Sequence, residues 1–129
     1  MASHRSRLAG AIIDVPRPDY DREVRFWAAG LERAAEVEAD DPDYTSLGEP
    51  TPGVELMIQA VGDETPRIHL DIETDDIEAE VARLIALGAT EVARIQTWVV
   101  MHDPLGTVFC VVRVQIPAQF EASATTWQR

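Results

Sequence analysis

RIHLDIETDDIEAEVARLIALGA, residues 67–89, contains the pattern that decides the fold. Its first part alternates apolar and polar side chains and predicts a strand over residues 67–73. Asp75 or Asp76 then stands where the N-cap of a helix is expected. Apolar side chains recur at three- and four-residue steps after this point, at Ile77, Val81, Leu84 and Leu87. Gly88 marks the helix end, so the stretch predicts a strand followed by an amphipathic helix.

The same pattern occurs earlier in the chain. AIIDVPRPDYDREV, residues 11–24, aligns without a gap with IHLDIETDDIEAEV, residues 68–81. A second match aligns GVELMI, which starts at Gly53, with GTVFCV, which starts at Gly106. Self-similarity of this kind indicates a duplicated structural unit.

Each half is predicted to contain a strand, a helix and three further strands, which is an α+β fold. In the first half we expect strands near residues 8–15, 34–38, 44–47 and 54–61, with a helix from Asp19 to about residue 30. Val24, Trp27 and Leu31 are expected on its buried side. In the second half we expect strands at 67–73, 90–94, 97–102 and 108–114, with a helix from 75 or 76 to 88.

We expect one domain over residues 1–129, with module one at about 8–61, module two at about 67–114 and a tail at 115–129. The tail is short and polar, and we expect it to be mobile unless Trp127 docks on a neighbour.

Composition excludes several classes of function. With 23 acidic and 11 basic side chains the formal net charge is −12, which opposes binding to nucleic acid or to an anionic membrane. No apolar run approaches the roughly 20 residues that span a bilayer. The N-terminus lacks the apolar core of a signal peptide, so we expect a cytoplasmic protein. The single cysteine, Cys110, rules out a disulfide within the chain.

The first stretch above and WVVMHDPLGTVFCVV, residues 98–112, resemble the second module of the actinobacterial glyoxalase-like domain group. This group is part of the vicinal oxygen chelate superfamily, which includes glyoxalase I, extradiol dioxygenases, methylmalonyl-CoA epimerase and fosfomycin- and bleomycin-resistance proteins. The resemblance covers about residues 8–114. It implies tandem βαβββ modules whose strands form a U-shaped mixed sheet around a cavity, with the helices outside.

The resemblance also implies a metal site built from four facing positions, one on the first and one on the last strand of each module. By the internal alignment these positions are occupied by Ile12, Met57, His69 and Cys110. Ile12 and Met57 cannot bind a hard or borderline cation. We therefore expect no metal and no other cofactor. A non-standard site that combines His69 and Cys110 with Asp14 or Asp71 stays open as an alternative.

His69, Asp14 and Asp71 are the candidate catalytic residues. Each aspartate follows a predicted ligand position by two residues, so strand alternation directs it to the same side. His69 either hydrogen-bonds or deprotonates a small ligand, or is an inherited residue paired with a neighbour such as Asp71 or a water. The aspartates either form an acid–base pair or accept hydrogen bonds from nearby backbone and arginine groups.

The cavity wall is expected to bind a ligand through a mixture of apolar and polar groups. Trp98 and His102 share one face of their predicted strand, Met57 adapts its shape, and the Gln59 amide fixes orientation. Ile12 and Cys110 complete the wall, although core packing is the simpler role for the thiol. We expect Glu78, Glu80 and Arg83 to form a solvated helix face.

These residues support two functional hypotheses. The first is a metal-independent protein of the glyoxalase/bleomycin-resistance type, a homodimer that binds a small apolar or aromatic molecule. The second is a divergent lyase, isomerase or dioxygenase that uses His69 with Asp14 or Asp71. In that case His69→Ala should abolish turnover and leave the melting temperature within a few degrees.

Overall fold

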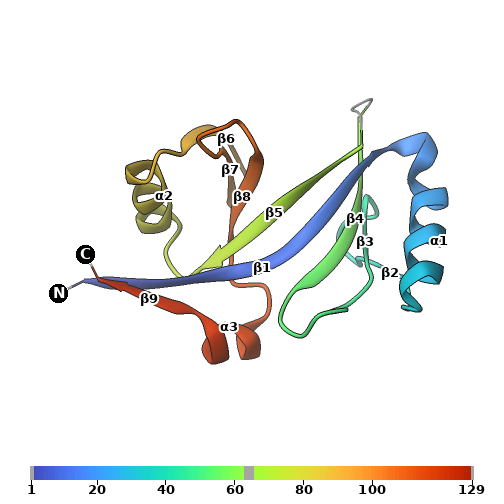
Figure 1. Ribbon diagram of the computed structural model, residues 1–129, viewed down its shortest axis with the longest axis horizontal. Coiled ribbons are helices and arrows are strands. Elements are labelled where there is room, and N and C mark those ends of the chain that lie inside the picture. The colour runs from blue at the N-terminus through green and yellow to red at the C-terminus, as the bar shows by residue number, and fades with distance from the viewer. Residues whose placement is uncertain (1, 63–65, 129) are drawn as a thin grey trace. The chain divides into compact units, whose positions relative to one another are not determined.

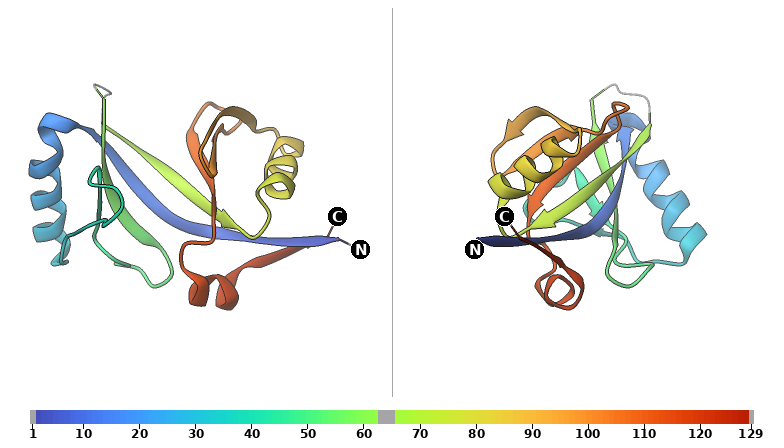
Figure 2. Two further views of the ribbon diagram at one scale, coloured as in Figure 1. Left: turned by 180° about the vertical axis from the view of Figure 1, so that it is seen from behind. Right: turned by 60° about the vertical axis from the view of Figure 1, so that its left-hand side comes forward.

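The computed structural model describes residues 2–62 and 66–128, and its elements follow the predicted order in both halves (Figures 1 and 2). The first half comprises β1 (Ser3–Pro16), the 3-10 turn η1 (Arg17–Asp19), α1 (Tyr20–Leu31), β2 (Glu36–Val37), β3 (Tyr44–Ser46) and β4 (Glu55–Val61). The second half comprises β5 (Arg67–Thr74), α2 (Ile77–Ala86), β6 (Thr90–Ile95), β7 (Trp98–His102) and β8 (Val108–Arg113). Two further elements follow, α3 (Pro117–Ser123) and β9 (Thr125–Gln128).

Strand pairing confirms the duplication and the α+β fold of tandem βαβββ modules. The order is β2-β3-β4-β1 in the first module and β6-β7-β8-β5 in the second. In both modules the first strand pairs in parallel with the last strand, and the remaining pairs are antiparallel. Two compact units result, one of Gly10–His69 and one of Leu70–Arg129 together with Met1–Ala9.

Each unit has its own hydrophobic core beneath its helix. Side chains of β1 and β4 pack with Tyr20 and Leu47, and Val24 and Trp27 of α1 pack against this cluster. In the other unit, side chains of β7 and β8 pack with Val81 and Ala89, and Leu84 packs against them. Leu31 departs from expectation, because it is 40% exposed at the end of α1, where Glu32 adopts a left-handed conformation.

The two helices begin differently. The Asp76 carboxylate accepts a hydrogen bond from the backbone N–H of Ala79, 3.0 Å away, and so caps α2. Asp19 precedes α1 without a side-chain capping bond and instead accepts a hydrogen bond from Arg22. Gly88 ends the α2 turn with a positive φ of 114°, a conformation that favours glycine.

The tail was expected to be mobile unless Trp127 docks on a neighbour, and in the structure the Trp127 ring contacts Ser6 and Arg83. Residues 117–123 form α3, and β9 pairs antiparallel with the start of β1, where Trp127 is opposite His4 (Figure 1). Phe120 of α3 is buried. Arg129, the last residue of the predicted tail, lies outside the described residues. No helix among the described residues is long and apolar enough to cross a membrane.

Candidate functional site

The predicted site residues of the first module share the sheet face that α1 does not cover. Ile13, Val15, Ile58 and Ala60 belong to the core beneath α1. Strand alternation therefore directs their neighbours Ile12, Asp14, Met57 and Gln59 to the other face. Ile12 pairs with Met57 and Asp14 pairs with Gln59, so the four side chains lie together.

The second module repeats this division. Val99, Met101, Phe109 and Val111 belong to the core beneath α2. Trp98 and His102 alternate with them on β7 and are half-buried on the uncovered face. Cys110 shares that face, because it pairs with Val100 on one side and with Asp71 on the other. Trp98 and His102 thus lie on one face of β7, and Cys110 lies on the same face of β8.

The strand registers of the two modules differ by two residues. Ile12 is opposite Met57 in module one, and the aligned repeats would place Cys110 opposite His69. In the structure Cys110 is opposite Asp71. A shift of two residues preserves the face of every side chain. Cys110 therefore still faces the same side as His69, but Asp71 takes the position directly beside it.

His69 is held by Asp14. Its Nδ1 lies 2.7 Å from Asp14 Oδ2, and Arg67 Nε lies 3.4 Å from the same oxygen. Asp14 is 1% exposed, and its Oδ1 has no hydrogen-bond partner among the described residues. A carboxylate at this distance favours the tautomer in which Nδ1–H donates to Asp14 and Nε2 carries the lone pair. The geometry therefore favours an oriented imidazole that can accept a proton at Nε2.

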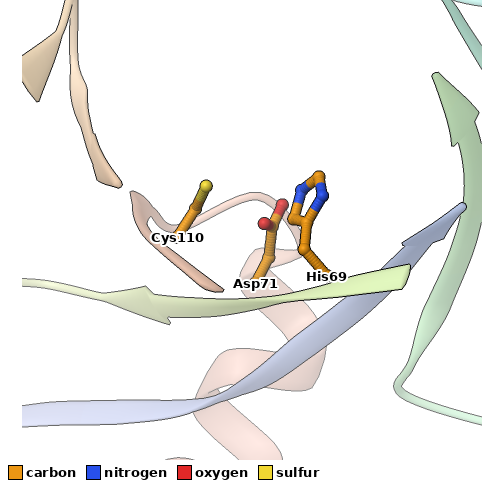
Figure 3. A group of neighbouring side chains, drawn as sticks. All are labelled: His69, Asp71 and Cys110. Atoms are coloured by element: carbon orange, nitrogen blue, oxygen red, sulfur yellow. The ribbon is translucent and has the colours of Figure 1, made fainter. Parts of the chain in front are cut away.

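Asp71 and Cys110 lie beside His69 (Figure 3). One candidate ligand atom from each of the three residues lies within 4.8 Å of the others. His69 and Asp71 belong to β5, and Cys110 belongs to β8, which pairs with β5. Imidazole, carboxylate and thiolate are all zinc ligand types. The cluster therefore brings together three of the residues that the sequence offered as an alternative set of metal ligands.

The four-residue metal site implied by the resemblance does not fit this chain. At two of its positions Ile12 offers an alkyl group and Met57 a thioether, and neither binds a hard cation. Among the described residues, Asp71 is the carboxylate that groups with both His69 and Cys110.

Sequence reasoning missed a buried ionic cluster at the start of α2. Glu80 is fully buried, and its carboxylate accepts hydrogen bonds from Arg83 Nε and Nη2 at 2.8 and 2.7 Å. The Nε2 of buried His4 lies 2.8 Å from the same carboxylate. The expected solvated face is therefore wrong for Glu80. The missed signal is that Glu80 stands three residues after Ile77 and four before Leu84, which places it on the core side of the helix.

The surroundings of Glu80 change its acidity. Burial alone would raise the pKa of Glu80, but hydrogen bonds from Arg83, His4 and Ser6 outweigh it and lower the pKa below the usual 4.5. A second buried acid, Glu73, pairs with Arg7 Nε at 2.6 Å and accepts hydrogen bonds from the backbone N–H groups of Gln115 and Ile116. Both acids bind the start of β1 to the second module, Glu80 through His4 and Glu73 through Arg7.

Comparison with known proteins identifies one family. The model of the glyoxalase-like domain matches residues 11–112. The structure is similar to methylmalonyl-CoA epimerase from Mycobacterium tuberculosis, with a TM-score of 0.58 and 20% identity over 90% of this chain and 91% of that one. No curated protein matches the sequence.

Two other solved structures have comparable scores. A protein described as NAD-dependent benzaldehyde dehydrogenase from Legionella pneumophila gives a TM-score of 0.57 at 9% identity, covering 81% of this chain and 99% of that one. A hypothetical protein from Bacillus halodurans gives 0.57 at 14% identity, covering 86% and 97%. At these identities the likeness shows the fold alone.

Proposed function

Because the chain belongs to the glyoxalase-like domain family of the vicinal oxygen chelate superfamily, we propose that it binds a small apolar or aromatic molecule at the sheet face that carries His69. In this proposal His69 contacts the polar group of the ligand, and the four-residue metal site of the superfamily is replaced by apolar wall. The observation that carries the proposal is the 2.7 Å contact between His69 Nδ1 and Asp14, which orients the imidazole.

Side chains on the uncovered sheet face of each module support a ligand with a substantial apolar body. In module one the half-buried Met57 supplies apolar surface on its uncovered sheet face. In module two the half-buried Trp98 supplies a flat ring on the uncovered face of its own sheet. Gln59 and His102 add polar groups that can fix orientation. The proposal includes a cytoplasmic location, in keeping with a single cysteine that cannot form a disulfide within the chain. It also includes a homodimer.

A ligand panel tests the proposal. Aromatic and apolar metabolites and drugs are titrated into the protein and saturable binding is measured by calorimetry, with His69→Gln as the test variant. We expect at least one compound to bind, and affinity to fall by about tenfold in the variant, which corresponds to roughly 1.4 kcal/mol. His4→Gln is the matched control, because His4 is also a buried histidine bound to a carboxylate. Equal losses in both variants, or no saturable ligand, would contradict the proposal.

The Asp14–His69 pair also favours a second candidate, a divergent lyase, isomerase or dioxygenase. A histidine whose Nδ1–H is bound to a carboxylate can take a substrate proton on Nε2. Asp14→Asn preserves size but removes the negative acceptor, so it should lower kcat by about tenfold or more with little change in KM. Measuring both constants on any compound that the panel shows to be converted distinguishes the candidates, since the binding protein has no turnover to lose.

A further inference from the structure

A separate pocket of about 440 Å³ lies on the other side of the second module's sheet, within the unit that contains Leu70–Arg129. It is bordered by α2, the beginning of β1, β5, β8, the turn between β7 and β8, and β9. Leu70 and Phe109 of its wall alternate along their strands with His69, Asp71 and Cys110. The pocket is therefore distinct from the proposed site. Its volume is in the range of small-molecule sites.

The walls of this pocket are apolar and partly open to solvent. Leu8, Leu70 and Leu87 are 44%, 43% and 68% exposed, although all three are large apolar side chains. Leu84 and Phe109 extend the apolar surface inward to the core beneath α2. Several large apolar side chains around one concavity favour an apolar ligand, since covering them removes that area from water.

Trp127 forms a rigid side of the pocket. Its Nε1–H donates a hydrogen bond to Ser6 Oγ at 2.9 Å. The guanidinium carbon of Arg83 lies 3.9 Å from the centroid of the Trp127 ring. Its backbone is paired with β1 opposite His4. Arg83 in turn is fixed by two hydrogen bonds to buried Glu80. This side of the pocket is thus already ordered before a ligand binds, so less conformational entropy is lost on binding.

The polar groups at the pocket favour an anionic end on the ligand. Arg83 donates hydrogen bonds to Glu80 from Nε and Nη2. The N–H groups of Nη1 are not part of these two bonds, and the Arg83 side chain is 23% exposed. Among the described residues of the lining, Asp103 is the one carboxylate, and it accepts hydrogen bonds from the backbone N–H groups of Leu105 and Thr107. In a chain with a net charge of −12, a partly exposed arginine beside an apolar pocket is a specific place for a carboxylate.

We propose that this pocket is a second binding site, for an amphiphile with an acyl chain or ring in the apolar part and a carboxylate at Arg83. The site is independent of His69. The site also gives the C-terminal strand β9 a role in binding, because Thr125 and Trp127 of β9 line the pocket.

Decanoate tests the site directly. Calorimetric titration below its micelle concentration is carried out on the full chain and on Leu70→Glu and Leu87→Glu, which place a charge in the apolar wall. We expect one equivalent to bind, with affinity at least tenfold weaker in both variants and weaker for 1-decanol than for decanoate. Ile85→Glu is the matched control, because Ile85 is 47% exposed on α2 and does not line the pocket. His69→Gln should leave decanoate binding unchanged, which separates this site from the proposed function.

Three results would overturn the proposal. One is the absence of saturable decanoate binding to the unmodified chain, and another is equal affinity in Leu70→Glu and Ile85→Glu. The third is a dimer, measured by sedimentation, that Leu87→Glu dissociates and Ile85→Glu does not. That result would assign the apolar wall to an interface with a second copy of the chain.

Discussion

At the scale of single residues, Glu80 should make stability depend on acid pH. Its pKa is lowered in the folded chain, so the unfolded state binds more protons and stability rises with pH in this range. The contribution is fully present above the usual pKa of 4.5 and is lost as the pH falls through the folded value. Urea unfolding between pH 7 and pH 3 should show a shallower loss of stability on acidification in Glu80→Gln than in the unmodified chain.

Glu78→Gln is the control for this measurement. The Arg94 hydrogen bond also lowers the pKa of Glu78, but that side chain is exposed and screened by solvent. Its pH profile should nearly match that of the unmodified chain. Identical profiles for Glu78→Gln and Glu80→Gln would show that the buried cluster does not control acid stability.

His69 is a second case in which the structure changes a residue-level expectation. The sequence predicts that His69→Ala leaves the melting temperature within a few degrees. In the structure the imidazole is the nearest partner of a carboxylate that is 1% exposed. Removing it leaves buried Asp14 with the longer Arg67 contact, so we expect a loss of about 1–3 kcal/mol in unfolding free energy. Denaturant melts should show a smaller loss for His102→Ala, which is only half-buried.

The sequence predicted which sheet face each candidate side chain lies on, but not which side chains contact one another. Alternation alone placed Ile12, Asp14, Met57 and Gln59 on one side, because the period of a strand is fixed. The choice of Asp14 over Asp71 as the partner of His69 Nδ1 depends on the spacing between strands that are distant in sequence. No local sequence pattern encodes that spacing. The contact between His4 and Glu80 could not be predicted either, because the two residues are 76 positions apart in the sequence.

At the scale of elements, the two helix starts provide a matched comparison. The Asp76 carboxylate caps α2 through the Ala79 N–H, whereas Asp19 makes no capping bond to α1. Asp76→Ala should therefore cost about 1 kcal/mol of unfolding free energy, and Asp19→Ala less than about 0.5. Denaturant melts of both variants measure the difference. Equal costs would mean that the capping bond contributes nothing beyond the general preference for aspartate at this position.

The strands and helices with a clear apolar period were predicted to within a few residues, but the chain ends were not. Residues 3–7 are mostly polar and give no strand signal, yet they extend β1 because β9 pairs with them. The pairing contributes backbone hydrogen bonds, and Trp127 adds its bond to Ser6. Structure that depends on a partner element more than a hundred residues away cannot be identified from a local window.

At the scale of the whole molecule, duplication was the strongest signal in the sequence. The aligned repeats predicted two βαβββ modules, and the repeated strand order confirms them. The β1–β4 and β5–β8 pairs differ in register by two residues, and this difference was not predictable. A shift of two residues keeps every side chain on the same face of the sheet, so the alternation of apolar and polar residues is the same for both registers.

The net charge of −12 leads to a last prediction, which concerns the proposed homodimer. Two copies with this charge repel each other, and added salt screens the repulsion. Sedimentation equilibrium should therefore show a dimer whose dissociation constant falls as sodium chloride is raised from about 20 mM to about 300 mM, a range in which the Debye length shrinks from above to below 10 Å. An interface held mainly by ion pairs between the copies would weaken with salt instead. A monomer at every salt concentration would contradict the homodimer itself.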